Sequence, residues 1–539
     1  MRNMSPTLLA ASLSALLAVS PLFSWAATVP AGVQLHVEQT LTRNNGSEPE
    51  TLDPSLIESV GAANLTRDLF EGLTAIDAQG KIVPGVAEKW RQVDPLTWSF
   101  QLRPQAKWQN GDPVTAQDFV YSFRRLVDPK TGSKYARTFG DFFFNGKEVS
   151  TGQKPPQELG VRAIDKATLE IKTSHPVKFL PELVSNPNLS PLHAMSIEKL
   201  GREWTKPGNL MGNGAYVLKG WQVNNKIVLE KSLGYWNADQ VKITRVTYLP
   251  VEDGHVDVKL FESGQNDWVY MLPPGSYDSY LKKYPKDTRN TPLLALRFYS
   301  IQTQSPFFKD VRVRQALSMV LDRDILAQKV TADGQLPAYG LIVKGVEGAD
   351  RIDYEWANWP MAKKVETAKA LMEQAGVKPG SKFTFSYNTS EYHKKMAIFA
   401  ASEWKTKLGL TVELEAMEFK VLIKKRHDGQ FEMARDGWNA DYNDATTFVA
   451  LVKCDSDQNH SRHCNKEAEQ LIQKGLKESD QAKRKVALNE AIRLIMNDYP
   501  MIPLLQYSLP RLVKSYVGGY STDNQMDRFR TQDLYIIKH

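Results

Sequence analysis

The sequence predicts an α/β fold with more than one domain, and three observations carry that prediction. The chain has 539 residues, which exceeds the roughly 100 to 200 residues of one ordinary domain. Between about 70 and 190, short strand-like segments and turns indicate a small α+β region. From 381 to 442, three strand-like segments alternate with two helix-like ones, the pattern of a βαβαβ unit.

The first 26 residues have the composition of an export signal. Arg2 supplies a basic start, LLAASLSALLAV an apolar run, and Ser24 and Ala26 flank Trp25 at a small-residue site, so we expect cleavage after Ala26. An uncleaved membrane anchor is the alternative, although the apolar run is short for a bilayer span. No cysteine stands at the cleavage site for lipid attachment. We expect a protein that is soluble after cleavage, in the periplasm of a Gram-negative bacterium.

Three local patterns follow in chain order. Residues 97–102 read as a strand, followed by an NGDP turn and a helix that opens after Thr115. The stretch 212–232 alternates apolar and polar residues around an Asn-Asn pair, which predicts a hairpin. In 310–325, apolar residues recur at helical spacing behind Asp310, a candidate N-cap, and the arginines of this helix are expected to face solvent.

The βαβαβ unit is the most informative region. It is predicted to contain strands at 381–388, 410–417 and 431–438 and helices at 393–409 and 419–429. The strands should be parallel and the crossovers right-handed. Open parallel sheets bind ligands beyond the carboxyl ends of their strands. Tyr387, Asn388 and His393 follow one such end, and the residues from Arg435 to Asp441 lie at another.

The residue types at these strand ends suit a zwitterionic ligand. Asp441 could pair with an amine, and Arg435 or His393 with a carboxylate, through charge-assisted hydrogen bonds. Trp438 could wall the pocket or face a cation. A free peptide carries both charges. The alternatives are a structural ion pair between Asp441 and Arg435, a surface position for His393 and a core position for Trp438.

Cys454 and Cys464 stand ten residues apart, and an oxidising compartment favours a disulfide between them. A metal site is the alternative, because His460 and His463 lie between the cysteines, although the spacing matches no regular zinc pattern.

Enzyme and nucleic-acid signatures are missing. The chain has no G-x-S-x-G, H-E-x-x-H or P-loop motif, and SIEK (196–199) is a chance-level match to S-x-x-K. The formal net charge of +7 is mild, and basic and acidic residues are interspersed. We expect no catalytic residue, no cofactor, no metal and no nucleic-acid partner. A hydrolase or a chaperone-like holdase is the alternative from a different class.

Motifs along nearly the whole chain carry a resemblance. In order, they are RNNGSEPETLDP, RDLFEGL, WSFQLRPQAKWQNGDPVTAQDFVYS, GNGAYVLKGW, DVRVRQAL, YNTSEYHKKMAI, GWNADYND and LYIIKH. The chain resembles the oligopeptide-binding members of the family 5 extracellular solute-binding proteins of bacterial ABC importers. The resemblance implies a two-lobed periplasmic-binding-protein (Venus flytrap) fold with an extra small inserted α+β domain. It further implies a monomer that captures a short peptide between its lobes and hands it to a membrane ABC permease without catalysis.

The domain boundaries that the resemblance implies interleave along the chain. They are a signal peptide at 1–26, domain I at 27–70, 191–292 and 508–539, the small inserted domain II at 71–190, and domain III, which holds the βαβαβ unit, at 293–507.

The resemblance also implies site residues. Asp441 would hold the peptide's amino terminus, while Arg435, His393 and Lys329 would meet its carboxyl terminus. The peptide backbone and side-chain pockets would be formed by Val60, Tyr135, Phe419, Arg426, His427, Gly437, Trp438, Asn439 and Tyr507.

Three positions depart from the family pattern. Asp436 stands where close relatives have a small residue, Asn439 where they often have cysteine or another uncharged residue, and Phe419 where a tryptophan is usual. Asp436 is expected to add a negative charge beside Arg435 and to weaken its hold on a carboxylate. Because the family also includes receptors for murein peptides, dipeptides, haem, nickel complexes and bile acids, a murein-peptide or non-peptide receptor is the alternative.

Overall fold

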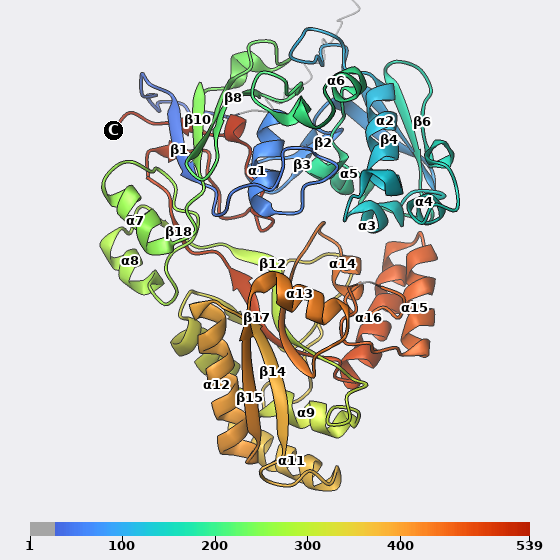
Figure 1. Cartoon of the computed structure of the whole chain (residues 1–539), viewed down its shortest axis with the longest axis vertical. Helices are drawn as coiled ribbons and strands as arrows, with labels where there is room; N and C mark the ends of the chain where they lie inside the picture. The colour runs from blue at the N-terminus through green and yellow to red at the C-terminus, as the bar shows by residue number, and fades with distance from the viewer. Residues whose placement is uncertain (1–26, 457) are drawn as a thin grey trace, which may run out of the picture.

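The computed structural model describes residues 27–456 and 458–539, so the predicted signal segment lies outside the described residues. The chain forms two lobes, one above the other in Figure 1. The lower lobe comprises residues 292–508, and the upper lobe comprises the rest of the described chain. The chain crosses between them where β11 (Thr288–Arg289) pairs with β18 (Arg511–Leu512), so two antiparallel segments join the lobes.

The upper lobe contains a four-stranded sheet of order β1-β10-β9-β8. Its strands are β1 (Thr40–Asn44), β8 (Tyr216–Gln222), β9 (Lys226–Lys231) and β10 (Arg245–Leu249). The predicted hairpin is confirmed as β8 and β9, and Asn224 takes the positive φ that its turn requires. This lobe also contains the helices α1 (Val60–Leu69), α6 (Ala194–Leu200), α7 (Gly254–Glu262) and α8 (Tyr277–Lys283).

A second four-stranded sheet, antiparallel and of order β4-β5-β7-β6, lies beside the first and confirms the small α+β region. Its strands are β4 (Ala87–Asp94), β5 (Thr97–Leu102), β6 (Val161–Ala163) and β7 (Thr168–Lys172). Helix α2 (Ala116–Val127) begins as predicted, because the carboxylate of Asp118 accepts a hydrogen bond from the backbone N–H of Thr115. The short elements of this lobe are β2 (Thr74–Ile76), β3 (Ile82–Pro84), α3 (Ala136–Gly140), α4 (Gly146–Ser150), α5 (Leu180–Leu183), β19 (Val517–Gly518) and β20 (Tyr535–Ile536).

The lower lobe is built on a six-stranded sheet of order β13-β17-β12-β16-β14-β15. Its strands are β12 (Pro292–Ile301), β13 (Leu336–Pro337), β14 (Lys382–Asn388), β15 (Thr411–Met417), β16 (Met433–Asn439) and β17 (Met501–Ser508). The predicted βαβαβ unit is confirmed, since β14 pairs in parallel with both β15 and β16. The sheet as a whole is mixed, because β12 pairs antiparallel with β16 and β17.

Helices complete this lobe. They are α9 (Val311–Val320), α10 (Arg323–Ile325), the π-helix η6 (Leu326–Thr331), α11 (Met361–Gln374), α12 (Glu391–Leu408), α13 (Phe419–His427), α14 (Thr446–Val449), α15 (Lys466–Lys477) and α16 (Gln481–Asn497). A core separate from that of the upper lobe runs from β12 to β17 and includes the fully buried Trp356 and Trp404.

The segment 310–325 starts as predicted, with Asp310 accepting a hydrogen bond from the N–H of Arg312. The expectation that its arginines face solvent is wrong for Arg314 and Arg323, which are buried. Arg314 donates to the carbonyls of Phe308 and Asp498, and Arg323 donates to the carbonyls of Ala338 and Pro503. A guanidinium has five N–H donors, so one buried arginine can donate to several backbone carbonyls at once.

Candidate ligand-binding site

One edge of β16 is open near the upper lobe. Pairing with β14 ends at Ala434, whereas pairing with β12 continues to Asn439. The N–H of Gln302 donates to the carbonyl of Glu432, and the N–H of Ala440 donates to that of Leu294. The backbone N–H and C=O groups of even-numbered residues in β16 therefore point toward β12, and those of odd-numbered residues point toward the open edge.

Three odd-numbered residues, Arg435, Gly437 and Asn439, thus face the open edge. Two of their groups take local partners, because Arg426 donates to the carbonyl of Arg435 and the N–H of Gly437 donates to the carboxylate of Asp436. The carbonyl of Gly437 and the peptide groups of Asn439 lie on this open edge without a partner among the described residues. An extended chain could add to the sheet there.

At the upper end of this edge, Asp441 forms no ion pair within the described part of the chain, and burial raises its pKa to about 6. Arg528 opposes that rise and donates from Nη2 to the backbone carbonyl of Asp441 at 2.6 Å. The carboxylate of Asp441, followed by burial, raises the pKa of Tyr135, which places this tyrosine of the upper lobe beside it. A desolvated carboxylate that forms no ion pair favours a cationic ligand group.

At the lower end, Arg435 and Arg297 form a cluster of positive charge, and His393 lies beside them. Burial and the guanidinium groups of Arg426 and Arg297 lower the pKa of Arg435 to about 9. Burial and the charges of Arg435 and Arg297 hold the pKa of His393 well below its usual value. Arg435 donates to Asn388 Oδ1 at 2.5 Å, so the two strand ends that the sequence singled out meet here. The cluster is suited to an anion.

Arg297 is a site residue that the sequence analysis missed. It lies on β12 directly opposite Gly437, and its guanidinium stands 3.9 Å from the ring centre of Tyr507. A Cβ atom at position 437 would come within 2.8 Å of Arg297 Nη1, so glycine makes room for this side chain. The segment 292–301 carries no local signal for this role; only the register between β12 and β16 reveals it.

The charge of Asp436 acts on Arg435, as the sequence predicts, but its contact partner is another arginine. Successive side chains of a strand point to opposite faces, and Asp436 forms a buried ion pair with Arg426 rather than with Arg435. It also accepts hydrogen bonds from Ser300 Oγ at 2.7 Å and His460 Nδ1 at 2.8 Å. Although burial opposes it, the positive charge of Arg426 and these bonds hold the pKa of Asp436 below its usual value.

Other predicted pocket residues have the following contacts. Phe419 is half-exposed and lies 4.9 Å below the guanidinium of Arg435. Trp438 donates to Thr447 Oγ1 at 2.9 Å and forms a partly buried wall. The Tyr507 hydroxyl contacts Met271 of the upper lobe. The ring of His427 lies edge-on to that of His460 at 4.9 Å.

Val60 and Lys329 lie farther out. Exposed Val60 lines a cleft of about 670 Å³, which contains Tyr270 and Met271 from the upper lobe and Tyr392 from the lower lobe. Lys329 is exposed on η6, which packs against α12, the helix that carries His393. The alternative of an ion pair between Arg435 and Asp441 is not realised among the described residues, because Arg435 donates to Asn388 and Asp441 forms no ion pair.

The cysteine prediction is confirmed, since Cys454 and Cys464 form a disulfide. The two histidines between them have carboxylate partners, His460 with Asp436 and His463 with Asp498. No group of three or more metal-ligand side chains occurs in the described ranges.

Comparison with known proteins places the chain in a family. The model of bacterial extracellular solute-binding proteins, family 5 Middle, matches residues 81–460. The chain belongs to this family. It is 43% identical to the periplasmic oligopeptide-binding protein OppA of Salmonella typhimurium over 98% of this chain and 97% of the relative. It is 37% identical to the periplasmic murein peptide-binding protein MppA of Escherichia coli over 97% of this chain and 98% of that relative.

Solved family 5 structures share the fold. OppA of Burkholderia pseudomallei is 49% identical, with a TM-score of 0.86, over 94% of this chain and 100% of that one. Haemophilus influenzae OppA in complex with the peptide RPPGFSPFR is 38% identical, with a TM-score of 0.84, over the same shares. The two-lobed solute-binding fold predicted from the sequence is thereby confirmed. No helix within 27–456 or 458–539 is long and apolar enough to cross a membrane.

Proposed function

We propose that this family 5 protein is the periplasmic receptor of an ABC importer, which captures short oligopeptides between its lobes and delivers them to a membrane permease. The arrangement of the open edge of β16 carries the proposal. An unpaired carboxylate stands at one end of that edge and uncompensated cations stand at the other. The names of the relatives, OppA above all, agree with a peptide ligand.

The charges set the direction of the ligand. With its amine at Asp441 and its carboxylate at Arg435, a peptide runs antiparallel to β16. Six residue steps separate the two side chains, or roughly 20 Å at about 3.3 Å per step. An extended peptide of three to five residues spans roughly 10 to 17 Å. The side chains of Asp441 and Arg435 reach toward the peptide and cover the remaining length. Main-chain bonds to Gly437 and Asn439 would give affinity without reading the peptide's side chains.

The roles follow from position. Asp441 binds the amine, with Tyr135 beside it. Arg435, His393 and the additional Arg297 bind the carboxylate. Lys329 would serve peptides of another length. The pocket walls are Val60, Phe419, Trp438, Tyr507 and, behind the strand, Arg426 with His427. The protein acts as a monomer and catalyses nothing, and its domains follow the interleaved boundaries expected from the sequence.

Calorimetry with chemically blocked peptides tests the proposal. A free tri- or tetrapeptide should bind, compact the molecule in X-ray scattering, raise its melting temperature and be recovered intact. The N-acetylated and the C-amidated forms should each lose at least about 2 kcal/mol of binding free energy, because one buried charge is left unpaired. Equal affinity for all three forms, or cleaved peptide, would contradict the proposal.

A murein-peptide receptor is the second candidate, favoured by the full-length similarity to MppA and by the presence of several cations in the lower cluster. Murein peptides carry more than one carboxylate. Competition between a murein tripeptide and trialanine decides between the candidates. Tighter binding of the murein peptide would make it the physiological ligand.

A further inference from the structure

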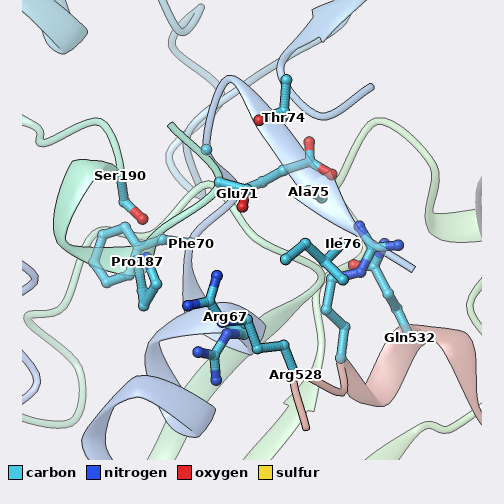
Figure 2. Close-up of a pocket in the computed structure, with 13 residues that line it drawn as sticks. Arg67, Phe70, Glu71, Thr74, Ala75, Ile76, Pro187, Ser190, Arg528 and Gln532 are labelled. Carbon is cyan, nitrogen blue, oxygen red and sulfur yellow. The ribbon is translucent and has the colours of Figure 1, made fainter. Parts of the chain in front are cut away.

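A small cavity lies in the upper lobe, where the end of α1 meets the C-terminal segment (Figure 2). The volume of the cavity is about 20 Å³. It has room for one small ion or a water molecule but not for an organic ligand. Arg67 and Arg528 form part of its wall, and their guanidinium groups lie next to each other.

Both arginines have nitrogen atoms without a partner. Arg67 Nε and Arg528 Nη1 are buried and form no hydrogen bond to any described residue. Arg67 uses Nη1 to bind Asn64 Oδ1 at 3.1 Å, and Arg528 uses Nη2 to bind the carbonyl of Asp441. Arg528 is 7% exposed. A buried N–H group without a hydrogen-bond acceptor costs free energy, so an acceptor is expected at these two donors.

The carboxylates of Glu182 and Asp441 act on Arg528, and that of Asp527 acts on Arg67, but none of them forms an ion pair with either guanidinium. Arg530, in the same wall, forms a two-bond ion pair with Asp533, whereas neither Arg67 nor Arg528 forms an ion pair within the described ranges. The carboxylate of Glu71 also lines the cavity, but it accepts hydrogen bonds from Tyr235 and Trp236. Burial, with the charge of Arg528 next, lowers the pKa of Arg67 to about 9.

We propose that this cavity binds one small inorganic anion, of the size and charge of chloride, between Arg67 Nε and Arg528 Nη1. Two guanidinium groups that form no ion pair and each hold an unpartnered N–H in a space of this size select by charge and by radius together. Peptide carboxylates are excluded, since the cavity has no room for an alkyl chain.

The site has a consequence for the ligand cleft, and this part rests on the proposed function. An anion that holds Arg528 would also fix its hydrogen bond to the carbonyl of Asp441, the residue proposed to bind the amine. Anion and peptide should then strengthen each other's binding, by the same factor in both directions.

Crystals grown with bromide in place of chloride provide the direct test. An anomalous peak between Arg67 and Arg528 is expected, and its absence would overturn the site. In solution, chloride compared with gluconate at constant ionic strength should raise the melting temperature of the peptide-free protein by about 1 to 2 °C. If the melting temperature is the same in the two salts, an anomalous peak would show binding at crystal concentration only, and the proposal would fail.

Two variants sharpen the solution test. Arg67→Gln should abolish the chloride response. Arg125→Gln is the matched control, because Arg125 is also partly buried in the upper lobe but is paired with Asp53, and it should retain the response. If Arg67→Gln fails to fold, Arg67→Lys keeps the charge while moving the donor, and it should show a weakened response; a full response in either Arg67 variant would overturn the assignment.

Peptide affinity measured in chloride and in gluconate separates the two proposals. A two- to tenfold gain in chloride supports the coupling. An unchanged affinity beside a confirmed bromide peak would remove the coupling and leave the anion site. Absence of peptide binding in both salts would contradict the proposed function, while the bromide and melting results still decide the anion site.

Discussion

Asp436 and Asp441 stand five residues apart in the sequence, and the structure gives them opposite surroundings. Asp436 has Arg426, His460 and Ser300 as partners, and its pKa is lowered. Asp441 has no ion-pair partner within the described residues, and its pKa is raised to about 6. A buried carboxylate whose partners are all within the fold supports the fold, whereas one that forms no ion pair is available to a ligand.

The largest effect is expected from removing the paired carboxylate. Asp436→Ala leaves Arg426 and His460 buried without a counterion, which should lower the free energy of unfolding by about 3 to 5 kcal/mol. Urea denaturation measures this. The double variant Arg426→Gln/Asp436→Asn should recover part of the loss, because the unpaired charge is gone. If Asp436→Ala is as stable as the wild type, Asp436 does not support the fold, and the contrast with Asp441 fails.

Removal of the unpaired carboxylate should affect binding instead of stability. Asp441→Ala is expected to change the free energy of unfolding little and to weaken binding of a free tripeptide by about 2 to 5 kcal/mol, roughly 30-fold or more. Calorimetry with the N-acetylated tripeptide is the control, since wild type and variant should bind it alike. Unchanged affinity for the free tripeptide would remove Asp441 from the amine site.

The disulfide loop supports the surroundings of Asp436, because His460 lies between Cys454 and Cys464. Replacing both cysteines with serine should lower the free energy of unfolding by about 2 to 3 kcal/mol, as expected for a loop of this length. Native-state hydrogen exchange should show faster exchange around 433–439. If exchange there is unaffected, the loop stabilises the protein without holding the ligand-binding strand.

The smallest effect is a pH dependence of affinity. Because the pKa of Asp441 in the ligand-free fold lies above its unfolded value, the stability that this group contributes is fully present below about pH 4 and is lost as the pH rises through about 6. An amine binds the ionised form, so tripeptide affinity should fall about tenfold between pH 7 and pH 5. Asp441→Asn should bind weakly, with a flat profile over this range. A wild-type profile that is equally flat would contradict the raised pKa.

Much of the fold could be predicted from local signals. Helix α2 starts where Thr115 and Asp118 form their cap, the β8–β9 hairpin turns where Asn224 takes a positive φ, and the βαβαβ unit lies where periodicity places it. The buried arginines of 310–325 were mispredicted because their acceptors are carbonyls as distant in sequence as Asp498 and Pro503.

The sequence by itself determined the family, the class of fold, the cysteine pair and the two ends of the candidate site, because these depend on residue type, spacing and short-range periodicity. Only the tertiary structure decided which charges are free. Arg297 enters the site through the register of β12 with β16, Asp436 leaves it through the alternation of side chains along β16, and Arg528 approaches Asp441 from a segment 87 residues away. Whether a charge is neutralised depends on distances of a few ångströms between residues far apart in the chain, and these distances exist only after folding.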